Sequence, residues 1–146
     1  MHAQMVLSLD DAKRIADACR AAAGEHGWPV VIAVVDDGGH LMYLERMDQT
    51  QKASSVVAVE KARTALLFKR PTKAIEEAVS SGRAAMMMLP GATPIEGGLP
   101  LVRDGQYLGA IGISGVQSFE DGIVAAAGVA CFDRILPTPN PNQEVK

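Results

Sequence analysis

The stretch VVIAVVDDGGHLMYLER, residues 30–46, predicts a β-hairpin. Val30–Val35 is an unbroken apolar run of mainly β-branched residues, which favour extended backbone. Asp36–Gly39 supplies the turn, because Asp and Gly tolerate the backbone conformations that a tight reversal needs. His40–Arg46 alternates enough to form the returning strand. We therefore expect a strand, a tight turn and an antiparallel second strand.

The same pattern recurs later in the chain. Leu99–Arg103, the Asp104–Gly105 turn and Gln106–Ser114 predict a second hairpin. Its last strand carries Gly109 and Gly112 in its interior. Because these positions lack side chains, a helix or a flat ligand can come close to the strand there.

A loop rich in glycine and proline precedes the second hairpin. Its sequence is TPIEGGLP, residues 93–100. Pro94 and Pro100 stiffen its ends, while Gly97 and Gly98 permit positive φ and leave backbone N–H groups open to a ligand. The loop is therefore a candidate binding edge.

Apolar residues at the helical period predict the remaining elements. We expect a first helix from residue 8 that ends near Gly24–Gly27, and further helices over residues 53–68, 72–80 and 118–132. Ser8, Thr72 and Ser118 are the expected capping residues of the first, third and fourth helices. The short apolar run Met86–Leu89 can be a buried strand or the end of a helix, and we favour a strand or an extended segment. The order of elements, with hairpins in place of crossovers, predicts the α+β class, in which helices cover one antiparallel sheet.

Composition predicts an ordinary globular protein. A chain of 146 residues with 48% hydrophobic and 21% charged residues can bury one core, and we expect a single domain over residues 1–136. The proline-rich residues 137–146 cannot continue a helix and are expected to form a mobile tail. The 14 basic and 17 acidic residues are interspersed, so no basic surface for nucleic acid is expected.

No targeting or membrane segment is predicted. The N-terminus lacks a basic cluster followed by an apolar run, so it has no signal-peptide pattern. The longest apolar stretch, Ile123–Phe132, is about half of the roughly 20 residues that a transmembrane helix needs. We therefore expect a soluble, cytoplasmic protein.

Cysteine and histidine positions do not form a metal-binding pattern. Cys19 and Cys131 lie far apart in helical segments and are expected to be small buried hydrophobes. His2, His26 and His40 lack the i, i+4 spacing of a helical metal site, and each is expected to be structural or solvent-exposed. We predict no metal site from these residues.

Five blocks of sequence carry a family resemblance: VVDDGG (34–39), ERMD (45–48), KARTA (61–65), PIEGGLP (94–100), and GAIGISG (109–115) with Glu120–Asp121. Together they resemble the GlcG-like family, whose members are also described as haem-binding or haem-degrading domains. A related domain forms the C-terminal part of PduO-type adenosyltransferases. The resemblance implies a profilin-like α/β/α domain with a five-stranded antiparallel sheet, often oligomeric, and haem or another tetrapyrrole as its ligand.

Three charged residues are candidates for catalysis. Arg46 and Asp48 flank Met47 just past a strand end, where the guanidinium could grip a carboxylate and Asp48 could act as a base. The alternative is an Arg–Asp pair that only stiffens the strand exit. Glu96 precedes the Gly97–Gly98 pair and could act as a general acid or base beside backbone donors, or be a solvated loop residue.

The candidate ligand-binding residues come from the same blocks. Lys61 could present its ammonium group to an acidic ligand or act as a Schiff-base amine if it is desolvated, or it could extend to water as such lysines usually do. Ser114 and Gly115 could offer donors to a ligand, or only form the turn after the strand. Asp121 is expected to be the capping partner of Ser118. The full predicted set is Arg46, Met47, Lys61, Glu96, Gly97, Gly98, Ser114 and Gly115.

Two functions remain open from these observations. The first is a binding domain for a small ligand, with haem or another tetrapyrrole implied by the resemblance; one His or Met47 would ligate the iron, although only 4% of residues are aromatic. The alternative is a catabolic enzyme that isomerises or hydrolyses a small carboxylated metabolite through Arg46 with Glu96 or Asp48. Both require residues 94–100 and 46–48 to share one pocket.

The last predicted helix bears on assembly. Residues 123–132 are apolar nearly all round, as expected for a helix that packs on both a sheet and a partner. A homo-oligomer is therefore predicted, and a third interpretation is an assembly partner without a ligand, which uses this helix as its interface.

Overall fold

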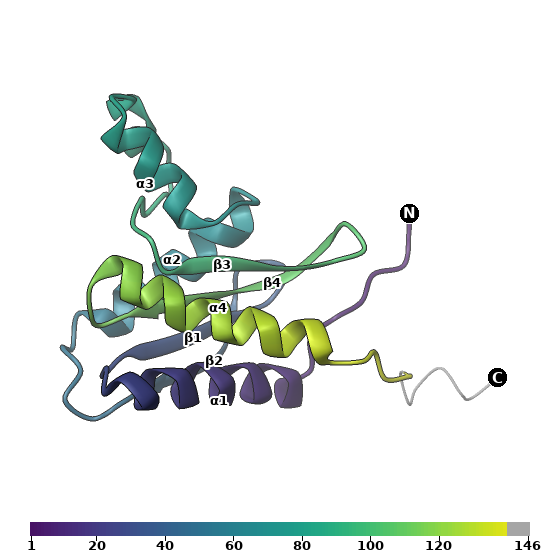
Figure 1. The fold of residues 1–146 in the computed structure, drawn as a ribbon. Coiled ribbons are helices and arrows are strands. Elements are labelled where there is room, and N and C mark those ends of the chain that lie inside the picture. The colour runs from purple at the N-terminus through teal and green to yellow at the C-terminus, as the bar shows by residue number, and fades with distance from the viewer. Residues whose placement is uncertain (140–146) are drawn as a thin grey trace.

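Four strands form one antiparallel sheet with helices on both faces (Figure 1). The structure, a computed structural model, describes residues 1–139. In chain order the elements are α1 (Leu9–His26), β1 (Val31–Val35), β2 (Leu41–Arg46), α2 (Ser54–Leu67), α3 (Thr72–Ser80), the 3₁₀ helix η1 (Ala84–Met88), β3 (Gly98–Arg103), β4 (Gln106–Ser114) and α4 (Ser118–Arg134). The predicted α+β class is confirmed.

The two predicted hairpins lie side by side in this sheet and are confirmed. The strand order is β2-β1-β4-β3, so β1 and β4 pair at the centre. All of β1 is buried, which explains its unbroken apolar run. The expectation of five strands is wrong, since residues 1–139 hold four. The expectation of a strand or an extended segment over Met86–Leu89 is wrong, because Met86–Met88 belong to the 3₁₀ helix η1 and Leu89 directly follows it.

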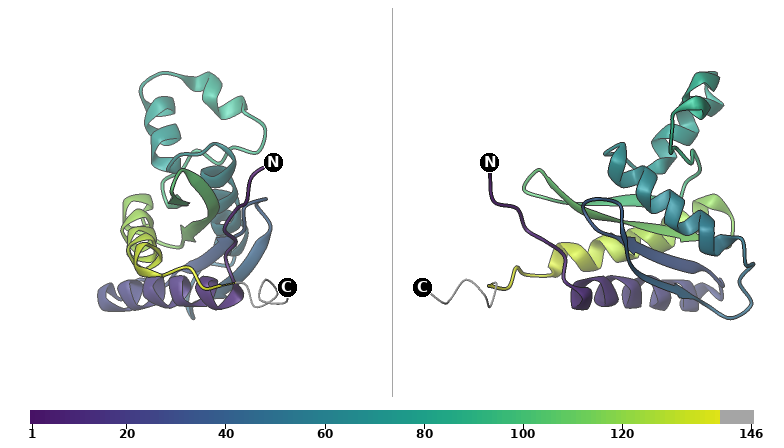
Figure 2. Two further views of the ribbon diagram at one scale, coloured as in Figure 1. Left: turned by 90° about the vertical axis from the view of Figure 1, so that its right-hand side faces the viewer. Right: turned by 180° about the vertical axis from the view of Figure 1, so that it is seen from behind.

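The two faces of the sheet are covered by different helices. Ile32 and Val34 join the core cluster that α1 and α4 cover, whereas Val31, Ala33 and Val35 pack with α2. This division follows from the alternation of side chains along a strand. The views in Figures 1 and 2 show α1 and α4 together on one face and α2 on the other. The result is the α/β/α layering that the family resemblance implies.

Glycines in the strands let α2 lie very close to the sheet. A Cβ atom at Gly112 would overlap the carbonyl oxygen of Ala58 and lie 2.7 Å from the amide nitrogen of Ala62. A Cβ atom at Gly98 would likewise overlap the carbonyl oxygen of Lys61. At these two positions the space left by the missing side chains is filled by helix backbone.

Helix α3 and η1 form an arm that stands away from the sheet (Figure 1). Within the arm, α3 buries only Thr72 and Ile75, and η1 buries no residue. Thr72 is not the capping residue that the sequence predicts, because Pro71 holds that position. The Thr72 hydroxyl instead accepts a hydrogen bond of 2.9 Å from the Gly98 amide, which ties the base of the arm to β3.

The two long outer helices begin differently. Helix α1 starts on the predicted capping box of Ser8 and Asp11. Helix α4 starts on a box formed by Gln117 and Glu120, one residue earlier than expected. The predicted cap through Asp121 is wrong because this carboxylate is turned into the protein interior.

The turn between β3 and β4 projects from the far end of the sheet (Figure 1). Asp104 and Gly105 have φ values of 50° and 75°, the left-handed conformations typical of a two-residue hairpin turn. A Cβ atom built on Gly105 has no neighbouring atom within 4 Å, so the tip is unobstructed.

The two cysteines differ in how deeply they are buried. Cys19 is buried as predicted, and burial raises the pKa of its thiol to about 12, whereas Cys131 is only half-buried.

Within residues 1–139, no helix has the length and hydropathy needed to cross a bilayer. Of the predicted tail, residues 140–146 lie outside the described part of the chain, so its mobility stays a prediction.

Replacing Gly112 by alanine is expected to lower the free energy of unfolding by about 3 kcal/mol, because the new methyl group must push α2 off the sheet. Gly24→Ala in α1 is the control: its Cβ meets nothing within 4 Å, and stability should rise by up to about 1 kcal/mol. Urea unfolding followed by circular dichroism measures both variants. Equal loss of stability in the two variants would contradict the close packing.

Candidate functional site

One end of the sheet collects most of the predicted site residues. In an antiparallel sheet, β2 and β4 end where β1 and β3 begin. Arg46 pairs with Val31 and Val31 pairs with Ser114, while Gly98 pairs with Gly112, two residues before Ser114 on β4. The 46–48 corner, the 94–100 loop and the end of β4 therefore lie at one end, as the predicted site requires.

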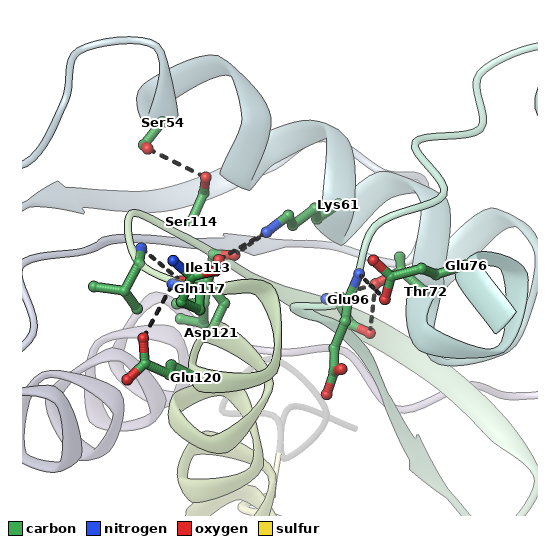
Figure 3. A network of polar contacts seen from close by, with 12 residues as sticks. Ser54, Lys61, Thr72, Glu76, Glu96, Ile113, Ser114, Gln117, Glu120 and Asp121 are labelled. Carbon is green, nitrogen blue, oxygen red and sulfur yellow. Dashed lines mark hydrogen bonds and ion pairs between the residues drawn. The ribbon is translucent and has the colours of Figure 1, made fainter. Parts of the chain in front are cut away.

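Arg46 and Glu96 nevertheless lie on opposite edges and opposite faces of that end. Three strand spacings separate β2 from β3, or about 14 Å. Arg46 shares a face with its partner Val31, which packs against α2. The Glu96 carboxylate lies against Gly122 of α4, on the other face, and points away from Lys61 (Figure 3). One chain does not bring these two side chains to a common ligand.

The 46–48 corner also spreads its side chains apart. Met47 faces the α1 side, where it packs with Trp28 against the main core, and its amide donates to the Val30 carbonyl at 3.0 Å. Asp48 is exposed in the following loop. Arg46 and Asp48 therefore lie on either side of the partly buried Met47 and do not line a shared pocket.

The cavities found in the structure lie elsewhere. One of about 510 Å³ is lined by residues 4–8 together with Arg103, Leu108, Ile135 and residues 137–139. A second of about 390 Å³ is lined by residues that include His2, Lys69 and Tyr107. Neither of these two cavities includes a predicted site residue.

Lys61 lies at the centre of a buried polar network (Figure 3). Its ammonium donates to Asp121 Oδ2 at 3.0 Å and to the Ile113 carbonyl at 2.9 Å, and both charged side chains are 2% exposed. The other Asp121 oxygen accepts from the Val116 amide at 3.2 Å. The expectation that Lys61 extends to water is wrong, because α2 lies too close to the sheet to leave it a path.

The surroundings of Asp121 act on its charge in opposite directions. Burial raises the pKa of the Asp121 carboxyl above its ordinary value, while the Lys61 ammonium and the amides of Val116 and Gly115 partly offset this rise. The ion pair links α2, β4 and α4 and leaves no unbalanced charge among these residues. The pairing partner of Lys61 was not identified from the sequence, because the two residues are 60 positions apart.

The glycine loop is packed rather than open. Gly97 and Gly98 are both buried. The Gly97 carbonyl accepts from the Ile113 amide at 2.9 Å, and a Cβ there would lie 2.9 Å from Lys61 Nζ. The Gly98 amide donates to Thr72, so the expectation of an open donor at this position is wrong. The space left by the missing side chains at these glycines is occupied by the Lys61 side chain and by the backbone of α2.

The end of β4 is packed in the same way. The Ser114 hydroxyl is buried and bonds to the Ser54 hydroxyl at 3.2 Å. A Cβ atom at Gly115 would crowd the Pro29 carbonyl and the Thr50 side chain. The alternative of a structural turn therefore describes Ser114 and Gly115 well.

An aromatic pair at this end escaped the sequence analysis. The rings of His26 and Trp28 stack with centroids 4.0 Å apart and planes 11° from parallel. Gly27, with φ 68°, forms the helix C-cap between them, and the Trp28 amide donates to the Ala23 carbonyl at 2.9 Å. In the sequence, Gly27 follows a histidine and precedes the single tryptophan. A helix that ends at this glycine could have indicated that the two rings lie close together.

The histidine at the opposite end has a different environment. His40 precedes β2, and its Nδ1 lies 3.1 Å from Asp36 Oδ1. Among residues 1–139, no three His, Cys, Asp or Glu side chains are grouped so as to hold a metal ion.

Breaking the buried pair is expected to be costly. Asp121→Asn should lower the free energy of unfolding by about 3–5 kcal/mol, because the Lys61 ammonium is left buried without a counter-charge. Adding Lys61→Met should recover about 1–3 kcal/mol of that loss. Urea unfolding of the single and double variants measures the coupling, and strictly additive losses would show that the charges do not interact.

Comparison with known proteins agrees with this fold. The family model "Haem degrading protein HbpS-like" matches residues 7–130. The chain is 46% identical to protein GlcG of Escherichia coli K12 over 114 residues, which are 78% of this chain and 85% of GlcG. The GlcG-like resemblance is confirmed.

Solved structures of similar proteins have the same fold. The crystal structure of Klebsiella pneumoniae protein ORFY matches with a TM-score of 0.84 and 29% identity, covering 92% of this chain and 97% of ORFY. The crystal structure of a PduOC–haem complex matches with a TM-score of 0.79 and 29% identity, covering 87% of this chain and 95% of PduOC. The chain therefore belongs to the HbpS-like family.

Proposed function

We propose that this chain is a ligand-binding domain whose ligand is haem or another tetrapyrrole. The support from relatives is the PduOC–haem complex, whose fold extends over 87% of this chain. A haem site needs an axial ligand such as imidazole or thioether and a largely apolar surface for the ring. In this chain, the candidate axial ligands are the histidines and methionines.

The stacked pair His26–Trp28 carries the proposal. His26 is an exposed residue at the end of α1. Trp28 supports one face of the imidazole and is half-buried against the core cluster that also holds Met47. An imidazole, an indole and a thioether thus lie at one end of the sheet, and we assign His26 as the axial ligand.

The acid/base alternative has less support from the geometry. It requires Arg46 to hold a substrate carboxylate within reach of Glu96. The separation of about 14 Å between their strands does not favour this on one chain. Asp48, the other candidate base, is exposed in a loop beside Arg46. Arg46 and Asp48 therefore remain candidates for contacting the edge of a bound ligand.

Titrating the purified protein with hemin should give a saturable shift of the Soret band at one hemin per chain. His26→Ala is expected to weaken binding at least tenfold, because it removes the axial imidazole. His40→Ala is the matched control, since His40 lies at the opposite end of the sheet, and it should bind hemin like the original chain.

The possible outcomes test the identity of the ligand and the location of its site separately. Absence of a saturable Soret shift in the original chain would reject the tetrapyrrole. Normal binding by His26→Ala together with loss in His40→Ala would keep the ligand and reject the assigned end of the sheet. Circular dichroism of each variant confirms that it is folded.

A further inference from the structure

A cavity of about 510 Å³ lies between the segments that precede α1 and follow α4. The start of α1 and the end of α4 lie at the same end of the molecule (Figures 1 and 2). Residues 4–8 and 137–139 line the cavity together with Arg103 of β3 and Leu108 of β4. The 18 residues of α1, about 27 Å of helix, separate this cavity from the stacked aromatic pair. It is therefore a different place from the site assigned above.

Apolar side chains from the core line part of this cavity. Leu7, Leu108 and Ile135 are 6%, 4% and 6% exposed, and all three belong to the main core cluster. The N-terminal segment is held at this end of the sheet, since the Met5 amide donates to Gln106 Oε1 at 3.1 Å. Sites for small molecules commonly have a volume of about 300–1,000 Å³ and a mostly apolar lining. The core side of the cavity is therefore suited to the hydrocarbon part of a ligand.

Arg103 brings a fixed positive charge to the cavity. Its Nη1 donates to the Ile135 carbonyl and its Nη2 to the Phe132 carbonyl, both at 2.6 Å, and its guanidinium carbon lies 4.5 Å from the centre of the Phe132 ring. A guanidinium carries five N–H donors, so further donors remain for another partner. Among residues 1–139, no Asp or Glu carboxylate forms an ion pair with Arg103. The cavity thus contains a rigidly held cation that has unused donors.

Asp11 is the acidic residue that lines the same cavity. Its Oδ2 accepts from the Ser8 amide at 2.9 Å in the first turn of α1, where the positive end of the helix dipole offsets a negative charge. The charge of Asp11 is therefore balanced locally. Arg103 meets the carbonyl oxygens at the end of α4, which are dipoles and carry no full charge. An anion is thus the partner that would complete the charge balance of the cavity.

We propose that this cavity binds a small amphipathic carboxylate of the medium-chain fatty acid class. The carboxylate accepts from two of the remaining N–H donors of Arg103, the bidentate contact that a guanidinium forms best. The hydrocarbon chain lies against Leu7, Leu108 and Ile135, which removes its apolar surface from water. This second site uses neither ring of the stacked pair, so it goes beyond the tetrapyrrole proposal and does not depend on it.

Displacement of a fluorescent anion tests the ligand class. The probe anilinonaphthalene sulfonate, whose emission rises in apolar surroundings, should bind the original chain saturably at one probe per chain. Decanoate should displace it competitively. Decanol has the same chain length without the charge, and it should displace the probe at least about tenfold less well, because it cannot form the charged contact with Arg103. Equal displacement by the two compounds, or a probe that does not saturate, would overturn the proposal.

Three variants test the location of the site. Arg103→Met removes the cation and should weaken decanoate binding at least about tenfold. Thr138→Trp keeps Arg103 and places a large ring at the exposed rim of the cavity, so it should prevent the probe from binding. Val56→Trp is the matched control, because Val56 is 67% exposed on α2, outside the cavity lining, and its variant should bind like the original chain. Circular dichroism checks folding, and Thr138→Trp decides the outcome if Arg103→Met does not fold.

A charge variant and hemin complete the test. Asp11→Asn removes a negative charge from the cavity wall and should tighten decanoate binding, the opposite of Arg103→Met. Weaker binding by Asp11→Asn, or unchanged binding by Thr138→Trp, would overturn the proposal. Thr138→Trp should take up hemin like the original chain, whereas displacement of hemin by decanoate would overturn the existence of a second site. A chain that binds decanoate but no hemin would reject the tetrapyrrole and support this cavity.

Discussion

The contact between the backbone of α2 and the glycines of β3 and β4 is the constraint on which the rest of the structure depends. At Gly98 and Gly112 a single added carbon atom would overlap the helix carbonyls. A helix this close leaves no route to water for Lys61, so its charge is balanced inside by Asp121 of α4. The ion pair is therefore a consequence of the packing. It also holds α4 against the sheet and so determines which side of that helix faces outward.

Local chemistry made much of the fold predictable. The two hairpins depend on Asp–Gly turns and β-branched runs, and the start of α1 depends on Ser8 and Asp11, three positions apart. Predictions failed where distant contacts decide the outcome. Asp121 has the correct spacing for a cap but is held by Lys61 instead. The Met86–Leu89 run has no helical or strand period that could have shown that it lies on the arm.

The candidate site was predictable in position but not in arrangement. Strand order and direction bring residues 46–48, 94–100 and 114–115 to one end of the sheet. Which face each side chain occupies depends on the register, which places Arg46 on the opposite face from Met47 and Glu96. Several of the marked residues prove to be packing residues, because glycines and a buried lysine produce the same pattern whether a ligand or a helix comes close.

The two ends of the sheet differ in how much change they can accept. At the crowded end, every loop is held by backbone contacts to a neighbouring segment. The Asp104–Gly105 tip points into open space and contributes nothing to the core. An inserted peptide, a fluorescent reporter or newly created termini would therefore be tolerated between Asp104 and Gly105, at the end of the sheet opposite the stacked rings, provided that Arg103 keeps its bonds to the end of α4.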